Sequence, residues 1–380
     1  MIHSRTAMTT KMPERFSLYL DLLRLLAAAM VLLSHYPLTE LQAAITDRYN
    51  FGYDAVIVFF VLSGYVISHA VDTKEKDGLT YSVNRIARIF PVAAVAVLLS
   101  LGLMVWGKQY NSQLYPDGFQ LQTTAYFLSR TLFFTNEFWW DDIRPFGNGP
   151  YWSLAFEVWS YIIFGLAVFT RAGWRVGLLL LAMLITGPKQ WLMLPIWLAG
   201  VAAYRCRDSI LLKPILAWLL CVCPVALFFA IQLNNPRDWS YLYVGAPLEG
   251  LLGHGLDGAA NFGWGYLLAL MVAVHLFAVR QLCLSSAVVK HRRLGSVIRQ
   301  LASYTFSLYI YHYPLLIFWQ ARLGGTRNFY DFSYRMLVYA GVLIPVFILG
   351  QLVERRKNSF RRAIVSALDA ARRLIALRVR

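Results

Sequence analysis

The residues of this chain that could do chemistry are a few ionisable side chains inside long apolar segments. Arg24 and His35 are eleven residues apart in the first such segment. On a helix, eleven residues make three turns plus ~20°, so both side chains would lie on one face, roughly 16 Å apart along the axis. An ionisable group inside a membrane helix is costly and marks a functional site by default. The alternatives are an arginine that reaches the inner interface and a histidine that caps the helix before Pro37.

Glu157 follows Trp152 and Ser153 at the start of a later apolar segment, at about the predicted depth of His35. A carboxylate at that depth could orient or polarise an imidazole, as in general-base pairs. Hydrogen bonding to a neighbouring helix is the alternative. His312 lies in the middle of the ninth apolar segment, where it could line a cavity or bond across helices.

Arg85 and Arg88 are three residues apart at the start of the third apolar segment. On a helix this spacing places both guanidinium groups on one face, and arginine forks bind phosphate with two hydrogen bonds. The pair would stand at the cytoplasmic mouth of that segment, where membrane topology alone also demands basic residues. The spacing therefore allows a phosphate site but does not require one.

The elements that must position these residues are membrane helices. Of the 380 residues, 58% are apolar and 15% are charged, whereas about 25% are charged in soluble domains. With a mean hydropathy of +0.51, the composition excludes a soluble domain, a disordered chain and a fibrous protein. The net charge of +16 does not indicate a nucleic-acid partner, which needs a basic face on a soluble domain. The four cysteines show neither redox nor zinc spacing, so we expect no disulfide and no metal site.

Ten apolar runs are predicted to be membrane helices. They cover about residues 16–35, 54–71, 88–106, 151–170, 174–188, 190–204, 212–233, 262–279, 301–320 and 335–353. A shorter run at 121–134 is predicted to be a re-entrant segment or a segment at the membrane interface, and not a span. With the N-terminus inside, most of the 36 Lys and Arg residues then fall on the cytoplasmic side. We therefore predict an all-α polytopic membrane protein, a bundle of about ten transmembrane helices with both termini cytoplasmic, in the inner (cytoplasmic) membrane.

The prediction divides the chain into a cytoplasmic N-terminal segment over 1–15, a transmembrane domain over 16–353 and a basic cytoplasmic tail over 354–380. Apolar residues recur at helical spacing among the arginines of the tail, which is typical of an amphipathic helix on an anionic membrane surface. A solvated tail is the alternative. The outside segments 107–150 and 234–261 mix aromatic residues with Asp and Asn. That mixture suits sugar rings, and an interfacial aromatic belt is the alternative.

Five short motifs follow one another along residues 16–353. They are Leu20-Asp21-Leu22-Leu23-Arg24 with His35, Phe59 to Ile67 with Ser63 and Gly64, Arg85 to Pro91, Trp152-Ser153-Leu154 with Glu157, and Ser303 to His312. Each motif is weak alone, but the ordered set at this spacing is specific. Together they resemble the acyltransferase-3 family of integral membrane acyltransferases, in its membrane-only form without a soluble hydrolase-type domain.

The resemblance implies an enzyme that transfers an acyl group, usually acetyl from acetyl-CoA, to a hydroxyl of a cell-surface glycan. It gives the catalytic role to His35 and associates Arg85 and Arg88 with the donor. The donor phosphates would lie against these arginines and Arg24, and the pantetheine arm would run inside the bundle to His35. Glu157 would fix the imidazole tautomer. The supporting residues would be Asp21, Ser63, Gly64, Trp152, Ser153 and His312.

Several choices stay open. A transporter with a pathway of His, Arg and Glu side chains is the alternative function, although no inverted repeat is evident. The expected partners are acyl-CoA, membrane lipid and a glycan acceptor, which could be O-antigen, exopolysaccharide, a lipid-linked sugar or a small glycoside. The acyl group could be acetyl or succinyl. The sequence indicates neither the oligomeric state nor whether a transient acyl-histidine forms.

Overall fold

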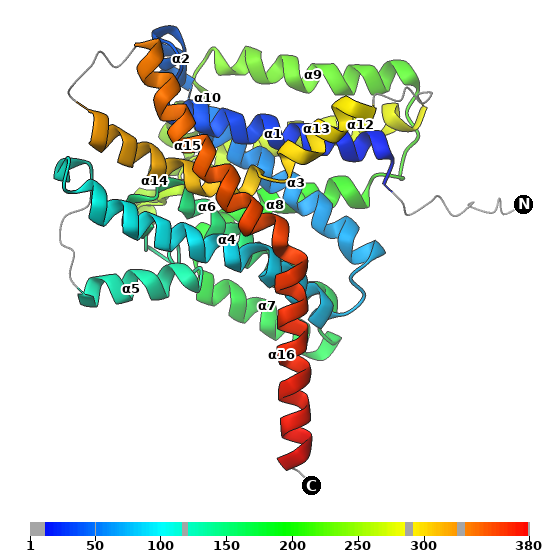
Figure 1. The fold of residues 1–380 in the computed structure, drawn as a ribbon. Helices are drawn as coiled ribbons and strands as arrows, with labels where there is room; N and C mark the ends of the chain where they lie inside the picture. Colours follow the sequence, from blue (N-terminus) through cyan, green and yellow to red (C-terminus); the bar gives the residue numbers. More distant parts are fainter. Residues whose placement is uncertain (1–11, 50, 116–120, 286–291, 325–330, 379–380) are drawn as a thin grey trace, which may run out of the picture.

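The protein is built from helices joined by loops (Figure 1). The computed structural model describes residues 12–49, 51–115, 121–285, 292–324 and 331–378, and these residues contain no β-strand. The predicted all-α class is therefore confirmed. The helices are α1 (Glu14–His35), α2 (Glu40–Tyr49), α3 (Phe51–Thr73), α4 (Gly78–Gly107), α5 (Leu121–Leu132), α6 (Trp152–Phe169), α7 (Ala172–Thr186), α8 (Pro188–Arg205), α9 (Pro214–Gln232), α10 (Pro236–Ser240), α11 (Ala246–Leu252), α12 (Phe262–Ser285), α13 (Arg292–Ala302), α14 (Thr305–Leu323), α15 (Phe332–Leu352) and α16 (Lys357–Arg378).

Seven helices of the described chain are long and apolar enough to cross a membrane, and α7 with α8 forms an eighth candidate as a pair bent by 119°. The body of each of the ten predicted runs is helical. The bend falls at Gly187, whose φ of +80° favours glycine, and Pro188 then starts α8. These helices make a multi-pass membrane protein. The count of ten spans and the cytoplasmic side of both termini remain predictions.

The helix that carries Arg85 and Arg88 begins earlier than its apolar run indicates. The sequence predicts 88–106, whereas α4 starts at Gly78 and Asp77 caps it by accepting a hydrogen bond of 2.8 Å from the Thr80 N–H. Arg88 thus lies ten residues, or ~15 Å, inside the helix. Hydropathy marks only the apolar part of a helix that begins with polar turns, so the structure extends the helix beyond the predicted run. The position of Arg88 at the mouth of the span stays a prediction.

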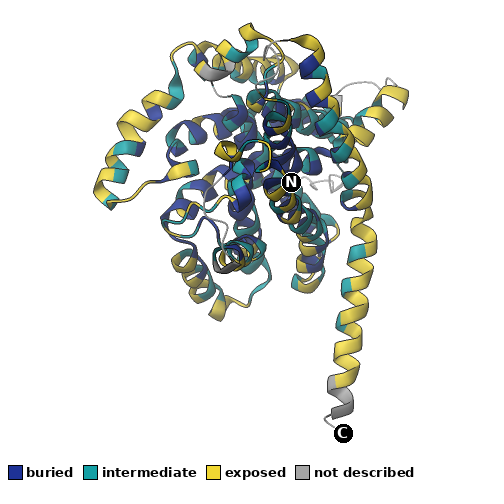
Figure 2. Ribbon diagram, turned by 60° about the vertical axis from the view of Figure 1, so that its left-hand side comes forward, coloured by how far each residue is buried: buried dark blue, intermediate teal, exposed yellow. Residues whose placement is uncertain are grey.

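Two helices lie at the edge of the bundle. α5 has 12 residues, ~18 Å in length, which is too short to cross a hydrocarbon core of ~30 Å. The tail forms the helix α16 as predicted, and α16 leaves the bundle at a steep angle to α1 and α4 (Figure 1). Most of its described residues are exposed (Figure 2). That direction suits a helix on a membrane surface, a location that remains a prediction.

The contact between α3 and α8 lies in the buried centre of the bundle and explains one motif residue. A Cβ atom on Gly64 of α3 would overlap the Trp197 carbonyl oxygen, and one on Gly200 of α8 would overlap the Val61 carbonyl oxygen. Small residues allow this close approach between membrane helices. Gly64 therefore sets the distance between two helices and lines none of the cavities described below.

Candidate active site

The two ends of the bundle differ in the residues that gather there. The inner end, where α1 begins, holds Glu14, Lys74 and Arg280. The outer end, where α1 finishes, holds His35 and Trp152. The predicted topology places the inner end in the cytoplasm. Between these ends lie an outer, a middle and an inner cavity.

His35 is the last residue of α1 and lines an outer cavity of about 270 Å³. Both outer segments that mix aromatic residues with Asp and Asn reach this cavity, and their use for sugar binding stays a prediction. The cavity wall includes Tyr53, Arg144, Trp152, Arg237, Asp257 and Tyr313.

The ring of His35 is held by two acceptors on its Nδ1 side. Nδ1 lies 2.9 Å from the Val31 carbonyl oxygen and 3.1 Å from Nε2 of His312. Because a carbonyl oxygen only accepts, Nδ1 carries the proton and Nε2 carries the lone pair. Nε2 of His35 has no hydrogen-bond partner among the described residues, so the basic nitrogen is available to a ligand.

His312 is fully buried behind His35. Its own Nδ1 donates to the Leu308 carbonyl oxygen at 2.9 Å, so its Nε2 is the atom that accepts from His35. Of the two uses predicted for His312, the bond across helices is therefore the one observed. This bond joins α1 to α14 and, together with the bond to the Val31 carbonyl oxygen, holds the Nδ1–H tautomer of His35, the role predicted for Glu157.

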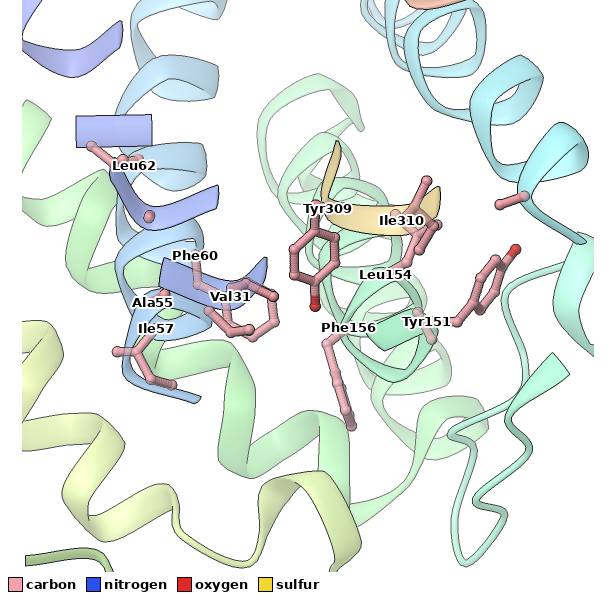
Figure 3. Close-up of a cluster of buried hydrophobic side chains, with 14 of the residues drawn as sticks. Val31, Ala55, Ile57, Phe60, Leu62, Tyr151, Leu154, Phe156, Tyr309 and Ile310 are labelled. Carbon is pink, nitrogen blue, oxygen red and sulfur yellow. The ribbon is translucent and has the colours of Figure 1, made fainter. Parts of the chain in front are cut away.

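A middle cavity of about 70 Å³ lies deeper in the bundle. It brings together five of the predicted site residues, from four helices: Arg24, Ser63, Arg88, Ser153 and Glu157. Two tyrosines that the sequence analysis missed complete its polar wall, Tyr161 and Tyr309. In Figure 3 the Tyr309 ring lies between Phe60 and Leu154.

The predicted pairing of Glu157 with His35 is not observed. Glu157 Oε1 accepts hydrogen bonds from Ser63 Oγ at 2.8 Å and from the Tyr161 hydroxyl at 2.5 Å, and Trp197 Nε1 donates to Ser63 at 3.2 Å. Glu157 lies five residues into α6, ~8 Å along the helix, whereas His35 ends α1. The carboxylate therefore faces the middle cavity with Arg24 and Arg88, and His312 takes its place beside His35.

An inner cavity of about 970 Å³ opens at the inner end. Its charged lining residues are Glu14, Asp21, Arg24, Lys74, Arg280 and Arg299. Asp21 lies 3.5 Å from the Arg24 guanidinium, which supports its predicted place in the site. The cations outnumber the carboxylates, so the cavity carries a net positive charge.

Neighbouring cavities share wall residues, so the three lie in a row through the bundle, and this row of cavities is called the path. Arg24 and Val66 line both the inner and the middle cavity, while Val56 and Tyr309 line both the middle and the outer cavity. The Tyr309 hydroxyl lies 2.6 Å from Ser153 Oγ and donates to the Pro150 carbonyl oxygen at 3.0 Å. Tyr309 is therefore fixed at the boundary next to His35. Its place one turn before His312 was the signal that could have identified it.

Arg85 lies apart from this path. It forms an ion pair of 2.5 Å with the buried Glu75 and lies over the rings of Tyr81 and Tyr161. It lines an apolar groove between α4 and α6 and none of the three cavities. The donor contact implied for Arg85 does not fit this location, because Arg85 lies outside the three cavities. Arg88, one turn further, does line the path.

A buried ion-pair cluster supports the outer cavity, and the sequence analysis missed it. Lys189, at the start of α8, lies 3.1 Å from both Glu137 and Asp257 and donates to the Asp141 carbonyl oxygen at 2.5 Å. Asp257 lines the cavity and has a φ of +48°, so the cluster holds a strained loop in place. A lysine at the outer end of an apolar run, against the usual charge bias, was the available signal.

Comparison with known proteins decides the family. A family model described as an acyltransferase domain matches residues 17–355. The chain belongs to the acyltransferase-3 family. It is 25% identical over 348 residues to an O-acetyl transferase of Shigella phage Sf6, and the match covers 88% of this chain and 94% of that protein. No solved structure matches.

This acyltransferase is therefore an O-acyltransferase enzyme, and the family suggested by its motifs is confirmed. The matched region includes every predicted site residue, from Asp21 to His312. Eight of these residues line the path of cavities: Asp21, Arg24, His35, Ser63, Arg88, Trp152, Ser153 and Glu157. Of the three others, His312 bonds to His35, Gly64 sets the distance between α3 and α8, and Arg85 lies outside the path. The chemical role of each residue remains a prediction.

Proposed function

We propose that this acyltransferase takes an acyl group, acetyl in the simplest case, from acyl-CoA at its inner end and transfers it to a hydroxyl of a glycan at its outer end. The observation that carries the proposal is the line of three cavities with common walls, which leads from a basic inner mouth to His35. Along such a path the donor and the acceptor meet from opposite sides, and neither has to cross the membrane.

The narrow middle cavity suits the pantetheine arm of CoA. Its volume of about 70 Å³ is small against the ~300–1,000 Å³ of pockets that bind whole small molecules. A flexible chain therefore fits there better than a nucleotide. Arg24 and His35 are separated by roughly 16 Å along α1, which is comparable with the reach of that arm. The thioester would then arrive beside His35.

The hydrogen bonds of His35 define its part in the reaction. The acceptor hydroxyl would give its proton to Nε2 while its oxygen attacks the thioester carbonyl carbon. When the carbon–sulfur bond breaks, His35 would return the proton to the departing CoA thiolate. General-base catalysis of this kind contributes about 10²–10⁴-fold. Attack by Nε2 itself, to form a transient acyl-imidazole, would use the same lone pair.

The outer cavity suits a sugar acceptor. The rings of Tyr53 and Trp152 are nearly parallel, at 7°, with centroids 6.3 Å apart, and the Tyr313 ring meets His35 edge-on at 5.0 Å. Aromatic faces of this kind can stack on the apolar faces of sugar rings. Arg144 and Arg237 line the same cavity and supply donors for hydroxyl groups.

The test is acetyl transfer by the purified protein. Radiolabelled acetyl-CoA and crude surface glycan are added, and label in the glycan is counted for the wild type, for His35→Ala and for His254→Ala. His254 is the matched control, because it stacks on Trp140 outside the three cavities. We expect transfer by the wild type and the control and a loss of about 10²–10⁴-fold in His35→Ala. Normal transfer by a folded His35→Ala variant would refute the proposal, and movement of a free solute without CoA consumption would favour a transporter.

A further inference from the structure

The inner cavity contains a set of cations whose role neither the motifs nor the family match assigns. Lys74 comes directly after α3, Arg280 lies in α12 and Arg299 in α13, and all three line the cavity together with Arg24 of α1. They come from four separate segments of the chain. Their convergence on one space therefore results from tertiary packing and not from the sequence of one basic loop.

Membrane topology alone predicts basic residues at the inner end. The cations that line the cavity differ from the other basic residues at this end in their location. Lys76 and Arg293 are also basic and exposed at this end, but they do not line the cavity. Arg280, in contrast, is almost fully buried and is held by Asp208 at 2.9 Å and by the Arg207 carbonyl oxygen at 2.8 Å. One of the cavity cations is thus built into the wall.

The size and connection of the cavity limit what it can bind. Its volume of about 970 Å³ lies at the upper end of the range for pockets that bind small molecules, ~300–1,000 Å³. Its inward continuation is the narrow middle cavity, which it meets at Arg24 and Val66. A ligand that fills both spaces needs a bulky anionic end and a thin arm.

We infer that the inner cavity is the site of the phosphorylated nucleotide end of the acyl-CoA donor, with Lys74, Arg280 and Arg299 as its phosphate-binding residues. This inference rests on the proposed function. It replaces Arg85, which lines none of the three cavities, by cations that line the inner cavity. The nucleotide stays in the wide inner cavity while the arm passes Arg24 toward His35. Arginine and lysine both bind phosphate with charge-assisted hydrogen bonds.

The test uses residues whose replacement leaves the fold intact. Lys74 is exposed, and the ion pair of Arg299 with Glu14 lies at the surface, where such pairs contribute ~0–1 kcal/mol. Binding of radiolabelled acetyl-CoA is measured in neutral phosphatidylcholine nanodiscs for the wild type, for Lys74→Gln/Arg299→Gln and for the matched control Lys76→Gln/Arg293→Gln. Acetyl-pantetheine, which lacks the nucleotide and its phosphates, serves as a second donor in turnover assays.

We expect Lys74→Gln/Arg299→Gln to raise the Kd for acetyl-CoA by at least about tenfold, because loss of one charge-assisted hydrogen bond raises a Kd by roughly tenfold. The control variant keeps the wild-type Kd, and turnover of acetyl-pantetheine stays equal in all three proteins. If the wild type binds no acetyl-CoA, the proposed function itself fails. If the wild type binds and the double variant binds equally well, only the inference fails.

Anionic lipid is the other source of phosphate at this end, and a second experiment distinguishes it from the donor. The binding experiment is repeated with phosphatidylglycerol in the nanodiscs. A double variant that keeps the wild-type Kd for acetyl-CoA but no longer responds to phosphatidylglycerol would assign the cations to a lipid headgroup and overturn the inference.

Discussion

Nε2 of His312 lies 3.1 Å from Nδ1 of His35, across 277 residues of sequence. The contact joins the last residue of α1 to the middle of α14 and leaves the lone pair of His35 on Nε2, at the outer cavity. The catalytic role proposed for His35 requires a fixed tautomer. The acceptors at its Nδ1 are the Val31 carbonyl oxygen and a second histidine, whereas the sequence suggested a carboxylate.

The first prediction concerns His312 as a positioning residue. His312→Phe removes one of the two acceptors for the Nδ1 proton, so we expect kcat to fall by about 10–100-fold, the cost typical of groups that orient metal-ligating histidines. The KM for acetyl-CoA should stay near the wild-type value, because His312 lines none of the cavities. His312→Gln, whose side-chain oxygen can accept in place of Nε2, should restore part of kcat. Equal losses in both variants would indicate a packing role only.

Arg88 and Arg85 should respond differently to replacement, although they form one motif. Arg88→Ala removes a cation from the middle cavity, and we expect a KM for acetyl-CoA raised by about tenfold, the value of one charge-assisted hydrogen bond. Arg85→Ala leaves the buried Glu75 without its cation, which typically costs ~3–5 kcal/mol of stability. Its donor KM should be unchanged. Steady-state kinetics and thermal unfolding in detergent separate the two effects, and a raised donor KM in a stable Arg85→Ala variant would contradict this assignment.

Lys189 should be essential for the stability of the outer cavity. Lys189→Met leaves the buried Glu137 and its neighbour Asp257 without their cation, and we expect a loss of ~3–5 kcal/mol together with a weakened affinity for the glycan acceptor. The control is Arg205→Ala. The Arg205 side chain is about half exposed, so its pair with Asp72 should contribute no more than ~1 kcal/mol. Equal melting temperatures for the two variants would argue against the cluster as a structural support.

Replacement of Gly64 tests whether the close approach of α3 to α8 contributes to stability. Gly64→Ala places a Cβ atom on the Trp197 carbonyl oxygen, and overpacking of this kind costs ~1–3 kcal/mol. The matched control is Gly177→Ala in α7, where a Cβ atom meets nothing within 4 Å and alanine favours the helix by up to ~1 kcal/mol. We expect a lower melting temperature for Gly64→Ala and an equal or higher one for Gly177→Ala. A Gly64→Ala protein as stable as the wild type would show that the helices can separate without cost.

Much of the site could be predicted because it depends on periodicity within single helices. Arg24 and His35 share a face of α1 for reasons of helix geometry, and both line the path of cavities. Ser153 and Glu157 lie one turn apart on α6 and share the middle cavity for the same reason. The helical class followed from composition, since backbone groups in lipid must be bonded within the segment.

The sequence by itself determined the long apolar helices and the family, together with the faces on which Arg24 and His35 lie. Only the tertiary structure decided which side chain meets His35, where Glu157 finds its partners, and that Arg85 points away from the path while Arg88 lines it. The reason is that helix periodicity fixes positions along one helix only. The rotation and depth of that helix against its neighbours depend on packing between distant segments, such as the contact of Gly64 with the α8 backbone.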